Sequence, residues 1–189
     1  MNVIATRKII AWVCVLILVT HSAVFAQEAR LTNVIVTNTR DDLLLYLSVD
    51  GAFTEQIQDA VLSGVPVSFS FFARLYEVRS FWLDDNIADI RVSHTIKYDN
   101  LKKEFTIQRS WEGHKPVVTQ SLEEAQRLMT EIDSLKVISL GRLEKGKQYQ
   151  IRAKAELSKL TLPFYLHYVL FFVSFWDFET DWYTIDFIY

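Results

Sequence analysis

The side chains with the greatest potential for chemistry in this 189-residue chain are its histidines and its single cysteine, Cys14. His94, His114 and His167 lie far apart in the sequence, whereas the histidine ligands of a zinc ion recur at short spacings. None of the three pairs with an adjacent carboxylate in a known motif. We therefore predict no metal site. We expect His94, which stands among the apolar positions of a strand, to be a half-buried structural residue.

The segment Gly141–Lys147 matches the pattern of a phosphate-binding loop, G-x-x-x-x-G-K. The next residue is Gln148, however, where such a loop needs a serine or threonine hydroxyl for Mg²⁺. A strand is predicted to follow, so no helix N-terminus would face a phosphate. The G-x-S-x-G motif of a nucleophilic serine does not occur in the sequence. The sequence thus predicts no nucleotide binding, no cofactor and no enzymatic activity.

The first 26 residues have the pattern of a secretory signal peptide. Arg7 and Lys8 form a positive n-region, an apolar run covers Ile9–Val19, and Val24 and Ala26 occupy the −3 and −1 positions of a cleavage site. We predict cleavage after Ala26 and a location in the periplasm or outside the cell. The alternative is an N-terminal anchor in the inner membrane, but a membrane-spanning helix needs about 20 apolar residues.

Cleavage would leave residues 27–189 as a single domain with 18 basic and 23 acidic side chains. This acidic balance argues against nucleic acid and against anionic lipid as partners, so contact with a membrane is not predicted. The only cysteine would leave with the signal peptide. The exported domain would therefore depend on its apolar core, without a disulfide.

Alternation of apolar and polar residues predicts a chain built mainly of strands. The predicted strands are Leu31–Asn38, Asp42–Gly51, Val65–Arg79, Ala88–Tyr98, Lys103–Arg109, Lys136–Leu143, Lys147–Leu160 and Trp182–Tyr189. Two helices are predicted over Thr54–Ser63 and Ser121–Leu135. Thr54 can cap the first, and Ser121 and Glu124 have the spacing of a capping box at the start of the second.

Leu143, Gly146 and Tyr149 resemble the tyrosine corner of immunoglobulin-like sandwiches, in which a tyrosine after a tight turn bonds back to the backbone. Helices do not alternate with the strands, which disfavours a parallel α/β fold. We therefore predict a mainly β protein. Its fold would be an antiparallel, immunoglobulin-like β-sandwich of about eight strands with two short α-helical insertions.

The aromatic residues are concentrated at the end of the chain, where Phe164–Tyr189 holds 12 of the 26. Burying an aromatic side chain removes about 150–250 Å² of surface from water, so this segment has to fill the core, a partner groove or a lipid phase. Rigid aromatics mixed with carboxylates suit protein recognition. The candidate interaction surface is therefore Trp176, Asp177, Glu179, Thr180, Asp181 and Trp182.

Two alternatives to an interaction module follow from the same aromatics. The first is a carrier of a small apolar ligand or lipid, with a cavity lined by Phe69, Phe71, Phe171 and Phe172. The second is a small outer-membrane β-barrel, because the last strand ends in an aromatic residue, as such barrels do. The two predicted helices have no place in a minimal barrel, which disfavours that alternative.

Several segments together carry a family resemblance over nearly the whole mature chain. They are Phe53-Thr54 through Gly64-Val65-Pro66-Val67, Ile96-Lys97-Tyr98-Asp99, Gly146-x-x-Tyr149, Leu162-Pro163 and Trp176-Asp177-Phe178-Glu179-Thr180-Asp181-Trp182. Through them the chain resembles the domain of unknown function 4390 family of exported bacterial proteins. The resemblance implies a single-domain protein of the cell envelope with no established activity. Some members are encoded near membrane sensor kinases, which implies a link to envelope signalling. The expected partner is an unknown envelope protein, such as a membrane sensor kinase.

Overall fold

The computed structural model describes residues 29–81, 83–113, 115–158 and 178–189. The predicted signal peptide, His114 and His167 lie outside these ranges, as do residues 164–177 of the aromatic-rich segment Phe164–Tyr189. Within them, no helix is both long enough and apolar enough to cross a membrane. The elements in chain order are β1 (Arg30–Asn38), β2 (Asp42–Asp50), α2 (Glu55–Leu62), β3 (Val67–Glu77), β4 (Asp85–Asp99), β5 (Glu104–Arg109), β6 (Val117–Thr119), α3 (Leu122–Thr130), β7 (Glu131–Ser139), the 3₁₀ turn η1 (Leu140–Arg142), β8 (Gln148–Leu157) and β9 (Tyr183–Ile188).

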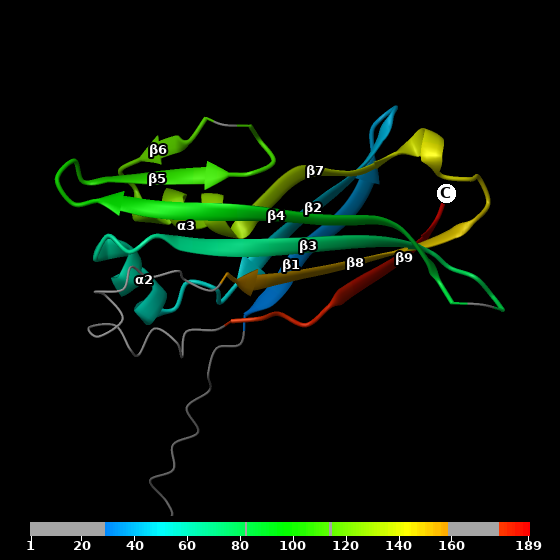
Figure 1. The fold of residues 1–189 in the computed structure, drawn as a ribbon, viewed down its shortest axis with the longest axis horizontal. Helices are drawn as coiled ribbons and strands as arrows, with labels where there is room; N and C mark the ends of the chain where they lie inside the picture. Colours follow the sequence, from blue (N-terminus) through cyan, green and yellow to red (C-terminus); the bar gives the residue numbers. More distant parts are fainter. Residues whose placement is uncertain (1–28, 82, 114, 159–177) are drawn as a thin grey trace, which may run out of the picture.

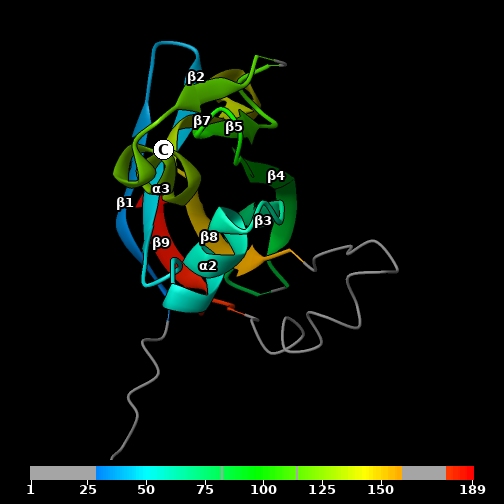
Figure 2. The ribbon, with the colours of Figure 1, turned by 90° about the vertical axis from the view of Figure 1, so that its left-hand side faces the viewer.

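The strands form two antiparallel sheets (Figure 1). The longer sheet has six strands in the order β6-β5-β4-β3-β8-β9, and the shorter has three in the order β1-β2-β7. The shorter sheet lies behind the longer one and crosses it obliquely, while α2 and α3 lie near the same end of the molecule (Figure 1, Figure 2). The predicted antiparallel β-sandwich with two short helices is confirmed, and the short strand β6 is an addition to the predicted set.

Alternation along β3 and β8 builds the core on one face of the longer sheet. Their buried apolar side chains are Val67, Phe69, Phe71, Ala73 and Leu75 in β3, and Tyr149, Ile151, Ala153, Ala155 and Leu157 in β8. The two strands pair in continuous register, from Phe69 opposite Leu157 to Glu77 opposite Tyr149. Because side chains alternate between the faces of a sheet, the outward residues of β3 and β8 also stand directly opposite one another. This register assembles the candidate site described below.

The second helix is shorter than the sequence predicts. It ends at Thr130 rather than at Leu135, and the chain continues as β7, which pairs with β2. This pairing contains register shifts, and Ser134 has a φ of +58°. A bulge inserts a residue, so the buried positions Ile132 and Leu135 are three residues apart. That spacing is the spacing of a helix, which explains why the sequence pattern was misleading here.

The predicted capping box at the start of α3 forms through an additional residue. The Ser121 hydroxyl accepts a hydrogen bond from the Glu124 N–H at 3.2 Å, as predicted. The Ser121 N–H, however, donates to the Thr119 hydroxyl at 3.1 Å, and this hydroxyl donates to the Glu124 carboxylate at 2.6 Å. The first helix is simpler, because the Thr54 hydroxyl accepts a hydrogen bond from the Ile57 N–H. Both helices therefore begin at the predicted caps.

The tyrosine corner is present. The hydroxyl of the buried Tyr149 accepts a hydrogen bond from the Glu144 N–H at 2.8 Å.

We expect Tyr149→Phe to lower the free energy of unfolding by about 1–2 kcal/mol, because the Glu144 amide loses its partner while the ring keeps its packing. Urea denaturation measures the difference. Tyr98→Phe, at a half-buried tyrosine of β4, is the control, and an equal loss in both variants would contradict a special role for the corner.

Candidate functional site

The structure describes four of the six residues of the predicted interaction surface. Trp176 and Asp177 lie outside the described residues. Glu179, Asp181 and Trp182 are exposed or partly exposed in the segment 178–182, which leads into β9. This segment runs beside the end of β8, where the Leu157 N–H donates to the Phe178 carbonyl at 2.9 Å. Three members of the predicted surface thus lie along one segment at the rim of the longer sheet.

Thr180 has a different position from its neighbours, because it is only 3% exposed. Its N–H donates to the Ala155 carbonyl at 2.9 Å, and its hydroxyl accepts a hydrogen bond from the Ala155 N–H at 3.0 Å. The Thr180 hydroxyl thus takes the place of a backbone carbonyl as the acceptor for the Ala155 N–H, because the regular pairing of β8 with β9 begins only at Tyr183. Thr180 therefore fixes the segment against β8 and does not itself face solvent.

Trp182 lies on the outward face of the longer sheet and is 40% exposed. Two cations lie over its ring: the Arg74 Cζ is 5.0 Å from the ring centroid and the Lys154 Nζ is 5.3 Å from it. A cation within about 6 Å of a tryptophan face is attracted by the quadrupole of the ring. The indole is therefore held in place by two neighbouring strands, although it stands at the edge of the sheet.

Further contacts of the same kind extend across β3 and β8. The Arg152 Cζ lies 4.5 Å from the Tyr76 ring centroid, and the Lys154 Nζ lies 5.3 Å from that of Phe72. These side chains meet because the register places Phe72 opposite Lys154 and Arg74 opposite Arg152. We call the resulting patch the aromatic–cationic face. It consists of Phe72, Arg74, Tyr76, Arg152, Lys154 and Trp182.

The two arginines of this face stand directly opposite each other, an arrangement in which like charges repel. Each has one acidic neighbour: the Arg74 Nε lies 3.1 Å from Asp89, and an Arg152 Nη lies 3.4 Å from Asp84. All four side chains are partly exposed, so these ion pairs contribute little to stability. A guanidinium has five N–H donors, so each arginine retains donors beyond those that these contacts use.

Lys154 is fully charged at neutral pH. Its Nζ lies 2.6 Å from the Glu179 carboxylate and 3.3 Å from that of Glu156. The hydrogen bond to Glu179 and then that to Glu156 raise the pKa of Lys154 above its usual value, against the opposing effect of burial. The ammonium group therefore keeps its charge over both the Phe72 and the Trp182 ring.

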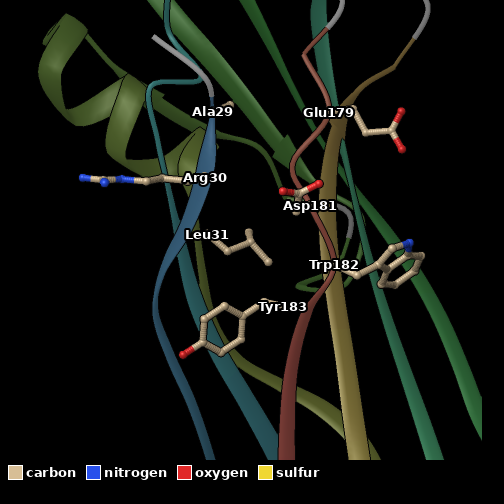
Figure 3. A pocket seen from close by; sticks show the side chains of 7 residues that line it. All are labelled: Ala29, Arg30, Leu31, Glu179, Asp181, Trp182 and Tyr183. Carbon is tan, nitrogen blue, oxygen red and sulfur yellow. The ribbon is translucent and has the colours of Figure 1, made fainter.

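Two grooves flank Trp182. One has a volume of about 300 Å³ and lies on the outward face, lined by Arg74, Tyr76, Arg152, Trp182 and Thr184. The other has a volume of about 380 Å³ and lies between the first residues of β1 and the segment 179–183. In this second groove Leu31, Asp181 and Tyr183 point into the space between the two strands, whereas Arg30, Glu179 and Trp182 point away from it (Figure 3). The segment before β9 therefore faces two separate openings.

The comparisons with known proteins give one positive result. The family model described as domain of unknown function (DUF4390) matches residues 26–186. The chain belongs to this family. Neither the curated proteins nor the solved structures yield a match to the chain. The family assignment predicted from the sequence is thereby confirmed.

The other candidate residues that the structure describes in this DUF4390 member are packed in the core. Phe69 and Phe71, predicted as the lining of an apolar cavity, are buried against other rings; Phe69 contacts Phe53 and Phe178 at centroid distances of 5.3 and 4.9 Å. Their predicted partners Phe171 and Phe172 lie outside the described residues. His94, predicted to be half-buried, is completely buried. In the described part of the chain, no three acidic, histidine or cysteine side chains are grouped to hold a metal ion.

Sequence reasoning missed five of the six residues of the aromatic–cationic face. The alternation along β3 and β8 does show that these side chains point outward. What brings them together is the pairing of residues some 80 positions apart, as in Arg74 opposite Arg152. The available signal was that outward aromatics occur in β3 and outward cations in β8. The sequence does not show that these side chains meet, because that depends on the register between the two strands.

Proposed function

We propose that this DUF4390 member is a non-catalytic binding module of the cell envelope. It recognises a partner protein through the aromatic–cationic face. Tryptophan, tyrosine and arginine are the residue types that dominate binding energy at protein interfaces. Here all three types surround one groove, with the Arg74 guanidinium over the Trp182 ring and the Arg152 guanidinium over the Tyr76 ring. The signal-peptide pattern of the first 26 residues supports the envelope location.

The observation that carries the proposal is the opposed pair Arg74 and Arg152 beside Trp182. Two guanidinium groups placed opposite each other repel, and the partly exposed ion pairs to Asp89 and Asp84 offset this repulsion only weakly. A carboxylate of a partner would relieve this repulsion and could accept two parallel hydrogen bonds from a guanidinium. The proposed partner is therefore an envelope protein that presents an acidic side chain next to an apolar one. A membrane sensor kinase is a candidate.

Affinity capture tests this function. We expect the tagged full-length chain, cross-linked in intact cells, to retain one or a few envelope proteins, and Trp182→Ala to weaken their binding by roughly 30-fold, the effect of losing about 2 kcal/mol at a hot spot. Leu101→Ala is the matched control, because Leu101 is 96% exposed in the turn between β4 and β5, outside this face. If wild type, Trp182→Ala and Leu101→Ala retained the same proteins in equal amounts, the face would not be the binding surface.

A further inference from the structure

Among the described residues, β9 is an edge strand whose outer side pairs with no other strand. It pairs with β8 alone among the described strands. The Tyr189 N–H donates to the Lys147 carbonyl at 3.2 Å, which fixes the phase of the ladder. Bonded and non-bonded residue pairs alternate in an antiparallel ladder, so odd-numbered residues of β9 bond to β8. The N–H and C=O groups of Thr184, Asp186 and Ile188 therefore point away from the sheet.

The other three edges carry features that block strand addition. β6 has only three residues. β1 contains a register shift between Thr32 and Ile35 with a φ of +50° at Asn33, and β7 contains register shifts and the positive φ of Ser134. Short strands and bulges are the usual protection of sheet edges. β9 pairs with β8 over six consecutive residues in unbroken register, and its sequence Tyr-Thr-Ile-Asp-Phe-Ile has no lysine, proline or glycine.

Large apolar side chains are exposed along this same edge. Ile188 is 75% exposed, and Trp182 and Tyr183 are also among the exposed large hydrophobic residues of the described chain. An open ladder edge with apolar side chains on both faces has the composition of a strand that pairs with another strand.

The residue order of β9 makes it complementary to itself. In an antiparallel pair about a two-fold axis at Ile185, Trp182 lies opposite Ile188 and Thr184 lies opposite Asp186. Tyr183 lies opposite Phe187 on the other face. Apolar residues then meet apolar residues, and a hydroxyl meets a carboxylate, with no like charges opposed. A self-complementary edge of this kind is what an isologous two-fold interface requires.

The two neighbouring registers of such a β9–β9 pair place less favourable residues opposite each other. Shifting the pair by two residues toward the C-terminus puts Asp186 opposite Asp186, where the charges repel. Shifting it the other way puts Ile188 opposite Thr180, whose N–H and hydroxyl already bond to Ala155. We therefore propose that β9 pairs with β9 of a second copy of this chain, antiparallel about a two-fold axis at Ile185. The proposal rests on the backbone edge and does not require the proposed partner protein, although Trp182 and Thr184 also line the groove of the aromatic–cationic face.

The oligomeric state of the full chain tests the proposal. We expect light scattering behind size exclusion to give twice the monomer mass at high micromolar concentration. Thr184→Pro should give monomers, with the association constant lowered at least about tenfold, because proline removes an outward N–H without removing a bond to β8. Thr184→Val keeps that N–H and should remain dimeric. A monomeric wild type, or a Thr184→Pro dimer, would overturn the proposal.

Cysteine cross-linking tests the register without relying on a variant that might unfold. In a Cys14→Ser background, Ile185→Cys should form a disulfide-linked dimer under mild oxidation, because Ile185 would face its own copy in a closely spaced, non-hydrogen-bonded pair. Ile188→Cys is the control, since random collision would favour this far more exposed position. Faster linking at position 188 than at position 185 would refute the two-fold axis. A complex with another protein that Thr184→Pro abolishes, while the wild-type chain stays monomeric, would assign the edge to a different occupant.

Discussion

Acidification from pH 7 to pH 4 is expected to lower the free energy of unfolding by about 3 kcal/mol through His94 alone. The imidazole ring is completely buried and packs against Phe71 at a centroid distance of 4.7 Å. Its Nδ1 lies 3.0 Å from the Met129 carbonyl, and its Nε2 lies 3.0 Å from the Trp111 Nε1. An indole N–H can only donate, so Nε2 accepts and the proton of the neutral ring is on Nδ1.

The sign of the effect follows from the two pKa values of His94. Burial is the main reason why the pKa of His94 falls from its ordinary value of 6.5 to about 4 in the folded chain. The unfolded chain therefore takes up a proton first as the pH falls. The contribution of His94 to the free energy of unfolding is present in full above pH 6.5 and is lost progressively between pH 6.5 and pH 4. Below pH 4 this residue causes no further loss. Protonation of Nε2 in the folded state would also break the hydrogen bond from Trp111.

Urea denaturation at a series of pH values measures the effect. Carboxylates also titrate at the acidic end of the range, so the informative quantity is the difference between wild type and His94→Gln, which has no titrating group at this position. We expect the difference to shrink by about 3 kcal/mol from pH 7 to pH 4. His94→Gln also has a stability cost of its own, which does not vary with pH. Parallel pH profiles of the two proteins would contradict the assignment.

The sequence predicts the strands well because each strand has one buried and one outward face. Strict alternation in β3 and β8 marks the residues that form the core, and the structure buries those same residues. The prediction is wrong where a bulge changes the period, as in β7, since Ile132 and Leu135 have a helical spacing without being in a helix. Tyr149 was predictable for a different reason: a tight turn followed by a tyrosine is a local pattern, and its hydrogen bond to Glu144 spans only five residues.

The candidate site was less predictable because it depends on contacts between distant strands. Trp182 was predicted from composition alone, and the structure places it on the rim of the longer sheet. Its neighbours Arg74 and Lys154 come from two other strands and lie about 30 to 110 residues away in the sequence. No local pattern encodes which strands are neighbours or in which register they pair. Composition could therefore identify one member of the face, and only the fold could identify the rest.

Replacing Phe69 with alanine is expected to lower the free energy of unfolding by about 3–5 kcal/mol, the usual cost of truncating a buried aromatic. Phe69 is fully buried in β3, and both of its aromatic contacts are close to edge-on, with Phe53 at 65° and Phe178 at 88°. It thus joins β3 to the loop before α2 and to the segment that leads to Trp182. Phe72→Ala is the control, since Phe72 is half-buried on the outward face of the same strand and should cost less.

Phe69→Ala should also increase the local opening of the segment 178–182, which chemical denaturation cannot resolve. Without the Phe69 ring, Phe178 loses its edge-on partner, and the three hydrogen bonds that hold the segment to β8 should open more often. Hydrogen exchange at the Leu157 and Thr180 amides measures this, because their acceptors are Phe178 and Ala155. Exchange that accelerates at these amides more than elsewhere in β8 would show that a core residue positions the surface segment. Uniform acceleration along β8 would mean that Phe69 stabilises the sheet as a whole, and that Trp182 is positioned by the cations over its ring instead.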